Sequence, residues 1–188
     1  NLRVNKKKFI YLISPNKIYK KFFKDLQKVL ETGKISFFQL RLKKYSFKHK
    51  ILIGQKIKNI CKKNKVKFLI NDDPILAKRL GADGCHLGQK DMNIKEARKI
   101  IGKKIIGITC HNSLRFAKKA IGSKASYLAF GSFYSSKTKR TKHVADIKII
   151  SKIKKITKTP IVAIGGISSE NYKNLLLNNA NFLAISGY

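Results

Sequence analysis

Short apolar segments alternate with longer amphipathic segments along the whole chain. In residues 19–30, for example, apolar side chains recur at the spacing of one helix face, at Phe22, Phe23, Leu26, Val29 and Leu30. The short segments predict buried strands over residues 9–14, 35–42, 66–70, 84–89, 104–109, 127–133, 160–164 and 182–186. The longer segments predict helices over residues 19–30, 49–63, 74–80, 93–101, 113–121, 145–156 and 168–178, the last with Ser168 or Ser169 as its cap.

Strict alternation of predicted strands with predicted helices is typical of a parallel sheet. An open doubly wound sheet would carry a glycine-rich phosphate loop after its first strand, and Ser14, Pro15 and Asn16 stand there instead. The pattern therefore predicts an α/β fold, a small (β/α)8 TIM barrel with a closed parallel sheet. We expect a single domain over residues 1–188 with the last helix missing from the chain, although this fold typically takes about 250 residues.

The stretch from residue 69 to residue 91 is the most informative part of the chain. It is predicted to be strand, helix and strand, with Pro74 opening the helix and Gly81 ending it. Two parallel strands in one such unit end on the same side of the sheet. Asp72 and Asp91 therefore follow neighbouring strand ends, where we expect their side chains to face one another.

These acidic residues stand out because acids are scarce, with 9 Asp and Glu against 43 Lys and Arg. Carboxylates that converge beside cations indicate a hard divalent ion, most simply Mg²⁺, which prefers oxygen ligands and keeps positions for a substrate phosphate. An aspartate in this position can instead cap the following helix. We assign Asp72 as the metal ligand together with Asp91, and Asp73 as the cap or as a residue behind the ligand.

The net charge of +34 predicts non-specific attraction of polyanions. The lysines are spread through every predicted helix, and no zinc-finger spacing, aromatic RNA-binding motif or basic heptad region occurs. We therefore interpret the lysines as solvated helix faces and expect no specific nucleic-acid partner. A phosphorylated small-molecule substrate would also be attracted by this field.

Membrane association is not expected, because no apolar run reaches the roughly 18 residues of a spanning helix and no signal-like segment opens the chain. The cysteines, Cys61, Cys85 and Cys110, are widely spaced and lack metal-binding spacing. They predict reduced thiols and a cytoplasmic protein. The oligomeric state, monomer or homodimer, is left open.

Polar residues at the predicted strand ends favour phosphate chemistry over acyl transfer, because they include cations, hydroxyls and carboxylates without a Ser–His–Asp set. The guanidinium of Arg41 matches phosphate oxygens, while Lys43 and Lys139 act as point charges. Gly165 and Gly166 allow a backbone N–H to approach an anion beside the start of a helix. Two anion sites, one linked to the metal and one not, predict two phosphorylated substrates.

Several motifs resemble the thiamine-phosphate synthase family. They are Phe38-Gln39-Leu40-Arg41-Leu42-Lys43, Asn71-Asp72, the run from Gly81 to Asp91, Phe130-Gly131, Thr138-Lys139 and the run from Ile161 to Ile167. The resemblance extends from the second to the eighth predicted strand in the right order and spacing. It implies a (β/α)8 transferase that joins hydroxymethylpyrimidine diphosphate to a (carboxy)thiazole phosphate, giving thiamine phosphate and diphosphate through a pyrimidine cation.

The resemblance also implies a role for each matching residue. Asp72 and Asp91 would hold Mg²⁺. The pyrimidine diphosphate would be bound by Gln39, Leu40, Arg41, Leu42, Lys43, Asn71, Thr109 and Lys139. The thiazole phosphate would be bound by Ser136, Lys137, Thr138, Gly166, Ile185 and Ser186. Catalysis would depend on Arg41, Lys43, Lys139 and Thr109.

The chain departs from the family pattern at Ser135-Ser136, where Pro-Thr is usual, and at Thr109, where Ser is common. Both changes keep hydroxyls in place. The segment over residues 137–142 is unusually basic, so Lys137 or Lys142 could replace Lys139. The second phosphate site is the less certain one, because the chain ends two residues after Ser186.

Two other functions remain open. A related thiazole tautomerase uses a histidine in the region of His111, although it would not be expected to keep both aspartates. The second is a non-enzymatic polyanion-binding protein that retains an ancestral barrel fold. It would bind nucleic acid without needing Asp72 or Asp91. His86 is expected to point into the barrel or to pack as a polar core residue.

Overall fold

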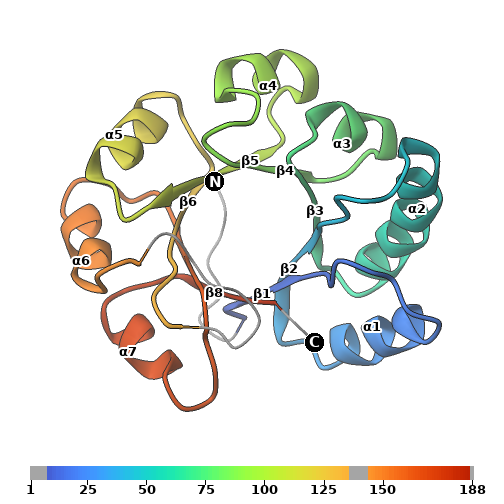
Figure 1. Ribbon diagram of the computed structural model, residues 1–188, viewed down its shortest axis with the longest axis horizontal. Coiled ribbons are helices and arrows are strands. Elements are labelled where there is room, and N and C mark those ends of the chain that lie inside the picture. Colours follow the sequence, from blue (N-terminus) through green and yellow to red (C-terminus); the bar gives the residue numbers. More distant parts are fainter. Residues whose placement is uncertain (1–7, 136–143, 187–188) are drawn as a thin grey trace.

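The computed structural model describes residues 8–135 and 144–186, and it forms a closed barrel of parallel strands. The strands pair in sequence order and β8 closes onto β1, as the helix–strand alternation predicted (Figure 1). The strands are β1 (Ile10–Ile13), β2 (Ile35–Leu40), β3 (Lys67–Asn71), β4 (Gly84–Leu87), β5 (Ile105–His111), β6 (Tyr127–Phe130), β7 (Ile161–Ile164) and β8 (Phe182–Ile185).

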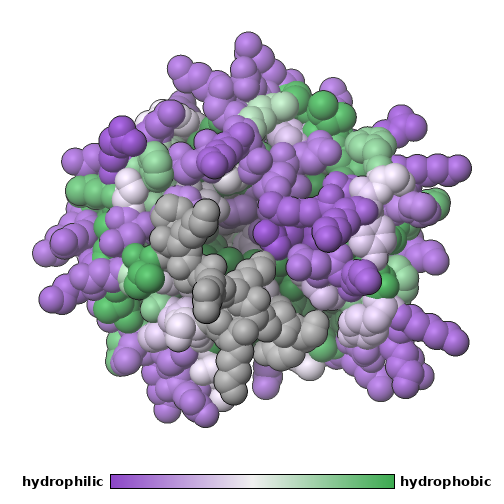
Figure 2. Space-filling view, viewed as in Figure 1, coloured by the Kyte–Doolittle hydropathy of each residue, from purple (hydrophilic) through white to green (hydrophobic). Residues whose placement is uncertain are grey.

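A ring of helices surrounds the barrel (Figure 1). The helices are α1 (Phe22–Glu31), α2 (Phe47–Lys63), α3 (Pro74–Leu80), α4 (Ile94–Ile101), α5 (Leu114–Gly122), α6 (Lys148–Lys154) and α7 (Tyr172–Leu177). In the described ranges no helix follows β8. Hydrophilic residues lie along every side of the molecular outline, which agrees with lysines spread over solvated helix faces (Figure 2).

Polar side chains cap several helix starts. Asp73 caps α3 by accepting a hydrogen bond from the backbone N–H of Leu76 at 2.9 Å. Asn93 caps α4 and Ser113 caps α5 in the same way. A cap of this kind contributes about 1 kcal/mol. Because Asp73 fills the cap position, the carboxylate of Asp72 is left for another role.

The predicted cap of the last helix is wrong. α7 begins at Tyr172, and neither Ser168 nor Ser169 caps it. The side chain of Asn171 instead accepts from the N–H of Ser168 at 2.9 Å and donates to the carbonyl of Gly166 at 2.9 Å. These bonds hold the chain in a turn between β7 and α7, so the helix starts later than its polar residues suggested.

Two apolar cores hold the barrel together. The larger core fills the space between the strands and the helices. The smaller core fills the barrel itself, where side chains from alternate strand positions meet. It consists of Tyr11, Ile13, Phe37, Leu69, Tyr127, Ala129, Val162, Phe182 and Ala184. Two of these are tyrosines, so the inner core carries phenol hydroxyls at the base of the barrel mouth.

Tyr127 can occupy the barrel interior because Gly107 lies beside it in the β5–β6 register. A Cβ built at Gly107 would stand 1.9 Å from the Cζ atom of the Tyr127 ring. A methyl group there would displace the ring, since such overpacking typically costs about 1–3 kcal/mol.

We therefore predict that Gly107→Ala lowers the free energy of unfolding by about 2 kcal/mol or more in urea denaturation. Gly122→Ala is the matched control, because a Cβ at Gly122 meets no atom within 4 Å at the end of α5. The control should be neutral or slightly stabilising, by less than about 1 kcal/mol. Equal unfolding midpoints for the two variants would contradict the packing described here.

Candidate active site

A cavity of about 790 Å³ opens at the carboxyl ends of the strands. This is the end at which barrels of this kind carry their active sites. The cavity wall brings together predicted site residues from the ends of five strands, β2, β3, β4, β5 and β8: Gln39, Arg41, Lys43, Asn71, Asp72, Asp91, Thr109 and Ser186. The structure thus gathers into one place most of the residues that the sequence assigned to the pyrimidine diphosphate and the metal.

Some assigned residues lie elsewhere. Leu40 and Leu42 are buried in the core between strands and helices and line a neighbouring cavity of about 380 Å³, not the main one. Gly166 and Ile185 are at the ends of β7 and β8 but do not line the main cavity. The predicted thiazole-phosphate residues Ser136, Lys137 and Thr138, and the predicted catalytic Lys139, lie outside the described residues.

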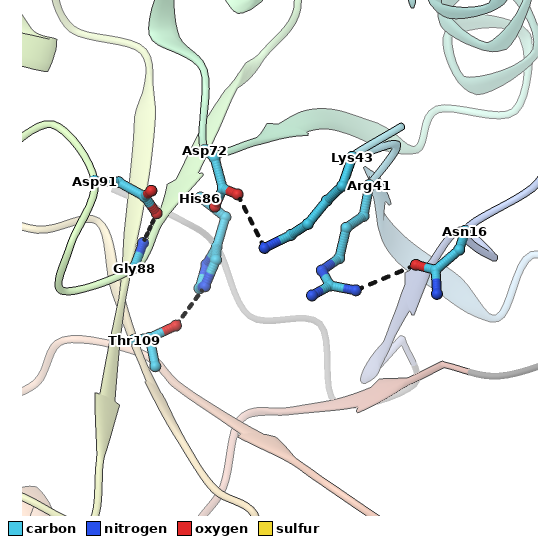
Figure 3. Close-up of polar contacts among 8 residues, drawn as sticks. All are labelled: Asn16, Arg41, Lys43, Asp72, His86, Gly88, Asp91 and Thr109. Atoms are coloured by element: carbon cyan, nitrogen blue, oxygen red, sulfur yellow. Dashed lines mark hydrogen bonds and ion pairs between the residues drawn. The ribbon is translucent and has the colours of Figure 1, made fainter. Parts of the chain in front are cut away.

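Asp72 and Asp91 both line the cavity, and the carboxyl of Asp91 lies close enough to act on the pKa of Asp72 through its charge and a side-chain hydrogen bond. Asp72 follows β3 in a left-handed conformation with φ of 66°, and its backbone N–H donates to the carbonyl of His86 at 2.8 Å. One carboxylate oxygen of Asp91 accepts from the N–H of Gly88 at 2.6 Å. The carboxylate of Asp91 is thereby fixed by a backbone N–H of its own loop (Figure 3), and the backbone of Asp72 is tied to the end of β4.

The environment of Asp72 disfavours ionisation of its carboxyl group beside the carboxylate of Asp91. Burial raises the pKa of Asp72 most, and the hydrogen bond and charge of Asp91 raise it further. Lys43 and Arg41 oppose this rise, and the Nζ atom of Lys43 lies 3.6 Å from Oδ2 of Asp72. A proton shared by the two carboxyls, or a cation bound between them, relieves the repulsion.

Arg41 is tied to the first loop of the barrel. Its Nη1 atom donates to Oδ1 of Asn16 at 3.3 Å, and its backbone N–H donates to the hydroxyl of Ser14 at 2.8 Å. Ser14 is only 4% exposed, and both Ser14 and Asn16 line the cavity. Neither residue was predicted to belong to the site, although their position directly after β1 is the signal that could have identified them.

His86 lies inside the barrel mouth, as the sequence analysis expected. Its ring nitrogens are hydrogen-bonded to the hydroxyls of Tyr127 and Thr109, each at 2.8 Å. Burial lowers the pKa of His86 from 6.5 to about 4; the charge of Asp91 opposes this and that of Arg41 adds to it. The imidazole is therefore neutral at physiological pH.

His111 also lines the cavity, at an irregular part of β5. Its backbone has a φ of 52°, and its ring packs at a tilt against Phe116 with centroids 6.3 Å apart. Left-handed conformations are uncommon for residues other than glycine and are often found at functional sites. This conformation turns the end of β5 at the cavity wall.

The glycines after β7 approach other backbone closely. Gly165 and Gly166 have φ of 103° and 59°, and a Cβ at Gly165 would stand 1.8 Å from the hydroxyl of Ser132. This supports the predicted need for glycine. The helix start expected directly beside them is displaced, because α7 begins only at Tyr172. We predicted that the positive end of this helix dipole would lie directly beside the second anion site. This prediction is wrong, because the helix starts farther along the chain.

Within residues 8–135 and 144–186, no cluster of three or more His, Cys, Asp and Glu side chains is arranged to hold a metal ion. No described helix is long and apolar enough to cross a membrane.

The family model described as thiamine monophosphate synthase matches residues 10–187. A curated thiamine-phosphate synthase of Pelagibacter ubique is 66% identical over 183 residues, which cover 97% of this chain and 88% of the relative. The chain belongs to the thiamine monophosphate synthase family. A second thiamine-phosphate synthase, from Erythrobacter litoralis, is 38% identical and covers 95% of this chain and 86% of its own length.

Solved structures agree with the family. A thiamine phosphate pyrophosphorylase from Pyrococcus furiosus superposes with a TM-score of 0.86 at 29% identity, covering 98% of this chain and 87% of that one. A tryptophan synthase α-subunit from the same organism gives a TM-score of 0.70 at 12% identity, which shows a shared fold alone. The chain is an enzyme of the thiamine-phosphate synthase family, and the curated relatives favour this function over the tautomerase alternative.

The lowered pKa of His86 predicts a pH dependence of stability. The unfolded chain takes up a proton near pH 6.5 and the folded chain only near pH 4, so stability is lost as pH falls through this window. We expect the free energy of unfolding to fall by up to roughly 3 kcal/mol from this residue alone. Denaturation of wild type and His86→Gln at a series of pH values should show a gap between them that changes with pH. Parallel pH profiles would contradict the assignment.

Proposed function

We propose that this enzyme joins hydroxymethylpyrimidine diphosphate to thiazole phosphate at the described cavity, with Mg²⁺ held by Asp72 and Asp91. The observation that carries the proposal is the contact between these two carboxyl groups beside Arg41 and Lys43 in a family of thiamine-phosphate synthases. Paired carboxylates with adjacent cations suit a metal-bound diphosphate better than either group alone.

The residues present fit Mg²⁺. Both donors are carboxylate oxygens, and Asp72 is 34% exposed, which leaves room for water and substrate in the coordination sphere. Burial and the neighbouring Asp91 raise the pKa of Asp72, and a cation bound beside the pair would relieve this cost of ionisation. When bound, Mg²⁺ neutralises charge on the departing diphosphate.

The chain's own cations would act on the same leaving group. The carbon–oxygen bond to the diphosphate breaks with both electrons leaving on the diphosphate. Arg41 offers two parallel N–H donors to its oxygens, and Lys43 adds a point charge. The lone pair of the thiazole nitrogen then forms the new carbon–nitrogen bond to the pyrimidine cation. Stabilisation of developing charge is the main catalytic contribution in this scheme.

The thiazole phosphate would bind across the opposite side of the mouth, toward the ends of β7 and β8. Ser186 lines the cavity there, and Gly166 lies close to the carbonyls of Tyr134 and Ser135. We assign the phosphate to Gly166, Ile185 and Ser186 together with Ser136, Lys137 and Thr138. Lys139 would contact the diphosphate from the same segment, so the two substrates meet between these walls.

We further propose that the enzyme acts in the cytoplasm. Cys61, Cys85 and Cys110 are buried free thiols, and burial raises the pKa of each to about 12, which keeps them protonated. A single domain over residues 1–188, as a monomer or homodimer acting on small phosphorylated substrates, remains our prediction.

Removing either carboxylate charge should abolish metal-dependent turnover. We predict that Asp72→Asn and Asp91→Asn each lower kcat about 100-fold or more in Mg²⁺, measured as diphosphate release with both substrates. Chelation of Mg²⁺ should stop the wild type, and its return should restore the rate.

Asp73→Asn is the matched control, because asparagine removes a neighbouring carboxylate while keeping the cap of α3. Its rate should stay within about threefold of wild type. Full activity of Asp72→Asn in Mg²⁺ would contradict the metal site. Metal-independent turnover of the thiazole phosphate alone would favour the tautomerase.

A further inference from the structure

A line of hydrogen bonds crosses the base of the cavity from β2 to β5. The Nε2 atom of Gln39 donates to the hydroxyl of Tyr11 at 2.8 Å, and that hydroxyl meets the hydroxyl of Tyr127 at 2.7 Å. The hydroxyl of Tyr127 contacts Nδ1 of His86 at 2.8 Å, and Nε2 of His86 contacts the hydroxyl of Thr109 at 2.8 Å. All five side chains line the cavity.

The number of protons that each group carries determines which atoms along this line donate and which accept. The amide nitrogen of Gln39 can only donate, and the hydroxyl of Tyr11 carries a single proton. The hydroxyl of Tyr11 is buried, and among the described contacts it meets only Gln39 and Tyr127, so its proton finds an acceptor only in the hydroxyl of Tyr127. Tyr127 in turn directs its own proton to Nδ1 of His86.

The neutral imidazole then carries its proton on Nε2. This N–H donates to the oxygen of Thr109, whose own hydroxyl proton is left to point away from His86. Among the described contacts, no protein group accepts that proton. Thr109 is therefore presented to the cavity as a hydrogen-bond donor.

Burial keeps the line from ionising. Tyr11 and Tyr127 are each 1% exposed, and burial raises the pKa of both phenols. Breaking one link would leave a buried polar group unpaired, which is unfavourable away from water. The line thus has one favoured arrangement of protons near neutral pH.

We propose that Tyr11, Tyr127 and His86 are positioning residues that fix the His86 tautomer and so make the Thr109 hydroxyl a donor toward an acceptor atom of the bound pyrimidine diphosphate. This inference rests on the proposed function for the identity of the ligand. The direction of the line is a property of the free protein. Gln39 anchors it, and the amide oxygen of Gln39 stays outside it.

The direct test is the tautomer of His86 in the free wild-type protein. Nitrogen-15 labelling of histidine, with long-range proton–nitrogen correlation near pH 7, distinguishes Nε2–H from Nδ1–H. His86→Gln identifies the His86 signals among the four histidines of the chain. The proposal predicts the Nε2–H form. The Nδ1–H form would reverse the donors between Tyr11 and Thr109 and overturn the proposal, whatever the enzyme's activity.

Kinetics test whether His86 acts through Thr109. His86→Gln keeps an N–H donor near the position of Nε2, whereas His86→Asn places its amide near Nδ1. We expect His86→Asn to lower kcat/KM about 10- to 100-fold and His86→Gln to retain clearly more activity. Circular dichroism of each variant confirms the fold before rates are compared.

A double-mutant cycle completes the test. If His86 positions Thr109, then His86→Asn should change kcat/KM by less than about twofold in a Thr109→Val background. If the two substitutions instead lowered kcat/KM independently, so that their single effects multiplied in the double variant, the positioning role would be overturned. Failure of the proposed function would appear instead as no turnover by the wild type, while the tautomer measurement would still decide the direction of the line.

Discussion

The contact between the carboxyl groups of Asp72 and Asp91 is the constraint on which the site depends. Two acids held together in a partly buried place repel one another when both are ionised. The fold maintains this arrangement through backbone hydrogen bonds from Asp72 to the carbonyl of His86 and from Gly88 to the carboxylate of Asp91. A site that keeps two carboxylates in contact is suited to a divalent cation. The neighbouring Arg41 and Lys43 then suit the anion that such a cation brings with it.

The barrel makes this arrangement possible by its register. Parallel strands bring β3 and β4 to the same rim, and the cap made by Asp73 frees the residue before it. Below the rim, the inner core carries Tyr11 and Tyr127, and Gly107 leaves the space that the Tyr127 ring occupies. The charged residues of the rim thus lie above neutral, hydrogen-bonded side chains inside the barrel. The net charge of +34 adds a long-range attraction for phosphorylated ligands.

Local patterns in the sequence predicted the parts of the structure that local physics determines. The strand–helix alternation predicted the barrel, and the position of Asp72 before Asp73 and Pro74 predicted which acid caps the helix. The hydrogen bond between Tyr11 and Tyr127 joins residues 116 positions apart, and no local pattern indicates it. The late start of α7 was missed because the side chain of Asn171 binds a turn rather than a helix N-terminus.

The central proposal is that Asp72 and Asp91 would together hold one divalent cation beside a bound diphosphate. Crystals grown with Mn²⁺ in place of Mg²⁺ and with the pyrimidine diphosphate would locate the ion by its anomalous scattering. The account predicts one peak about 2.0–2.3 Å from a carboxylate oxygen of Asp72, a carboxylate oxygen of Asp91 and an oxygen of the diphosphate. A peak bound to the diphosphate alone, or to neither aspartate, would contradict it.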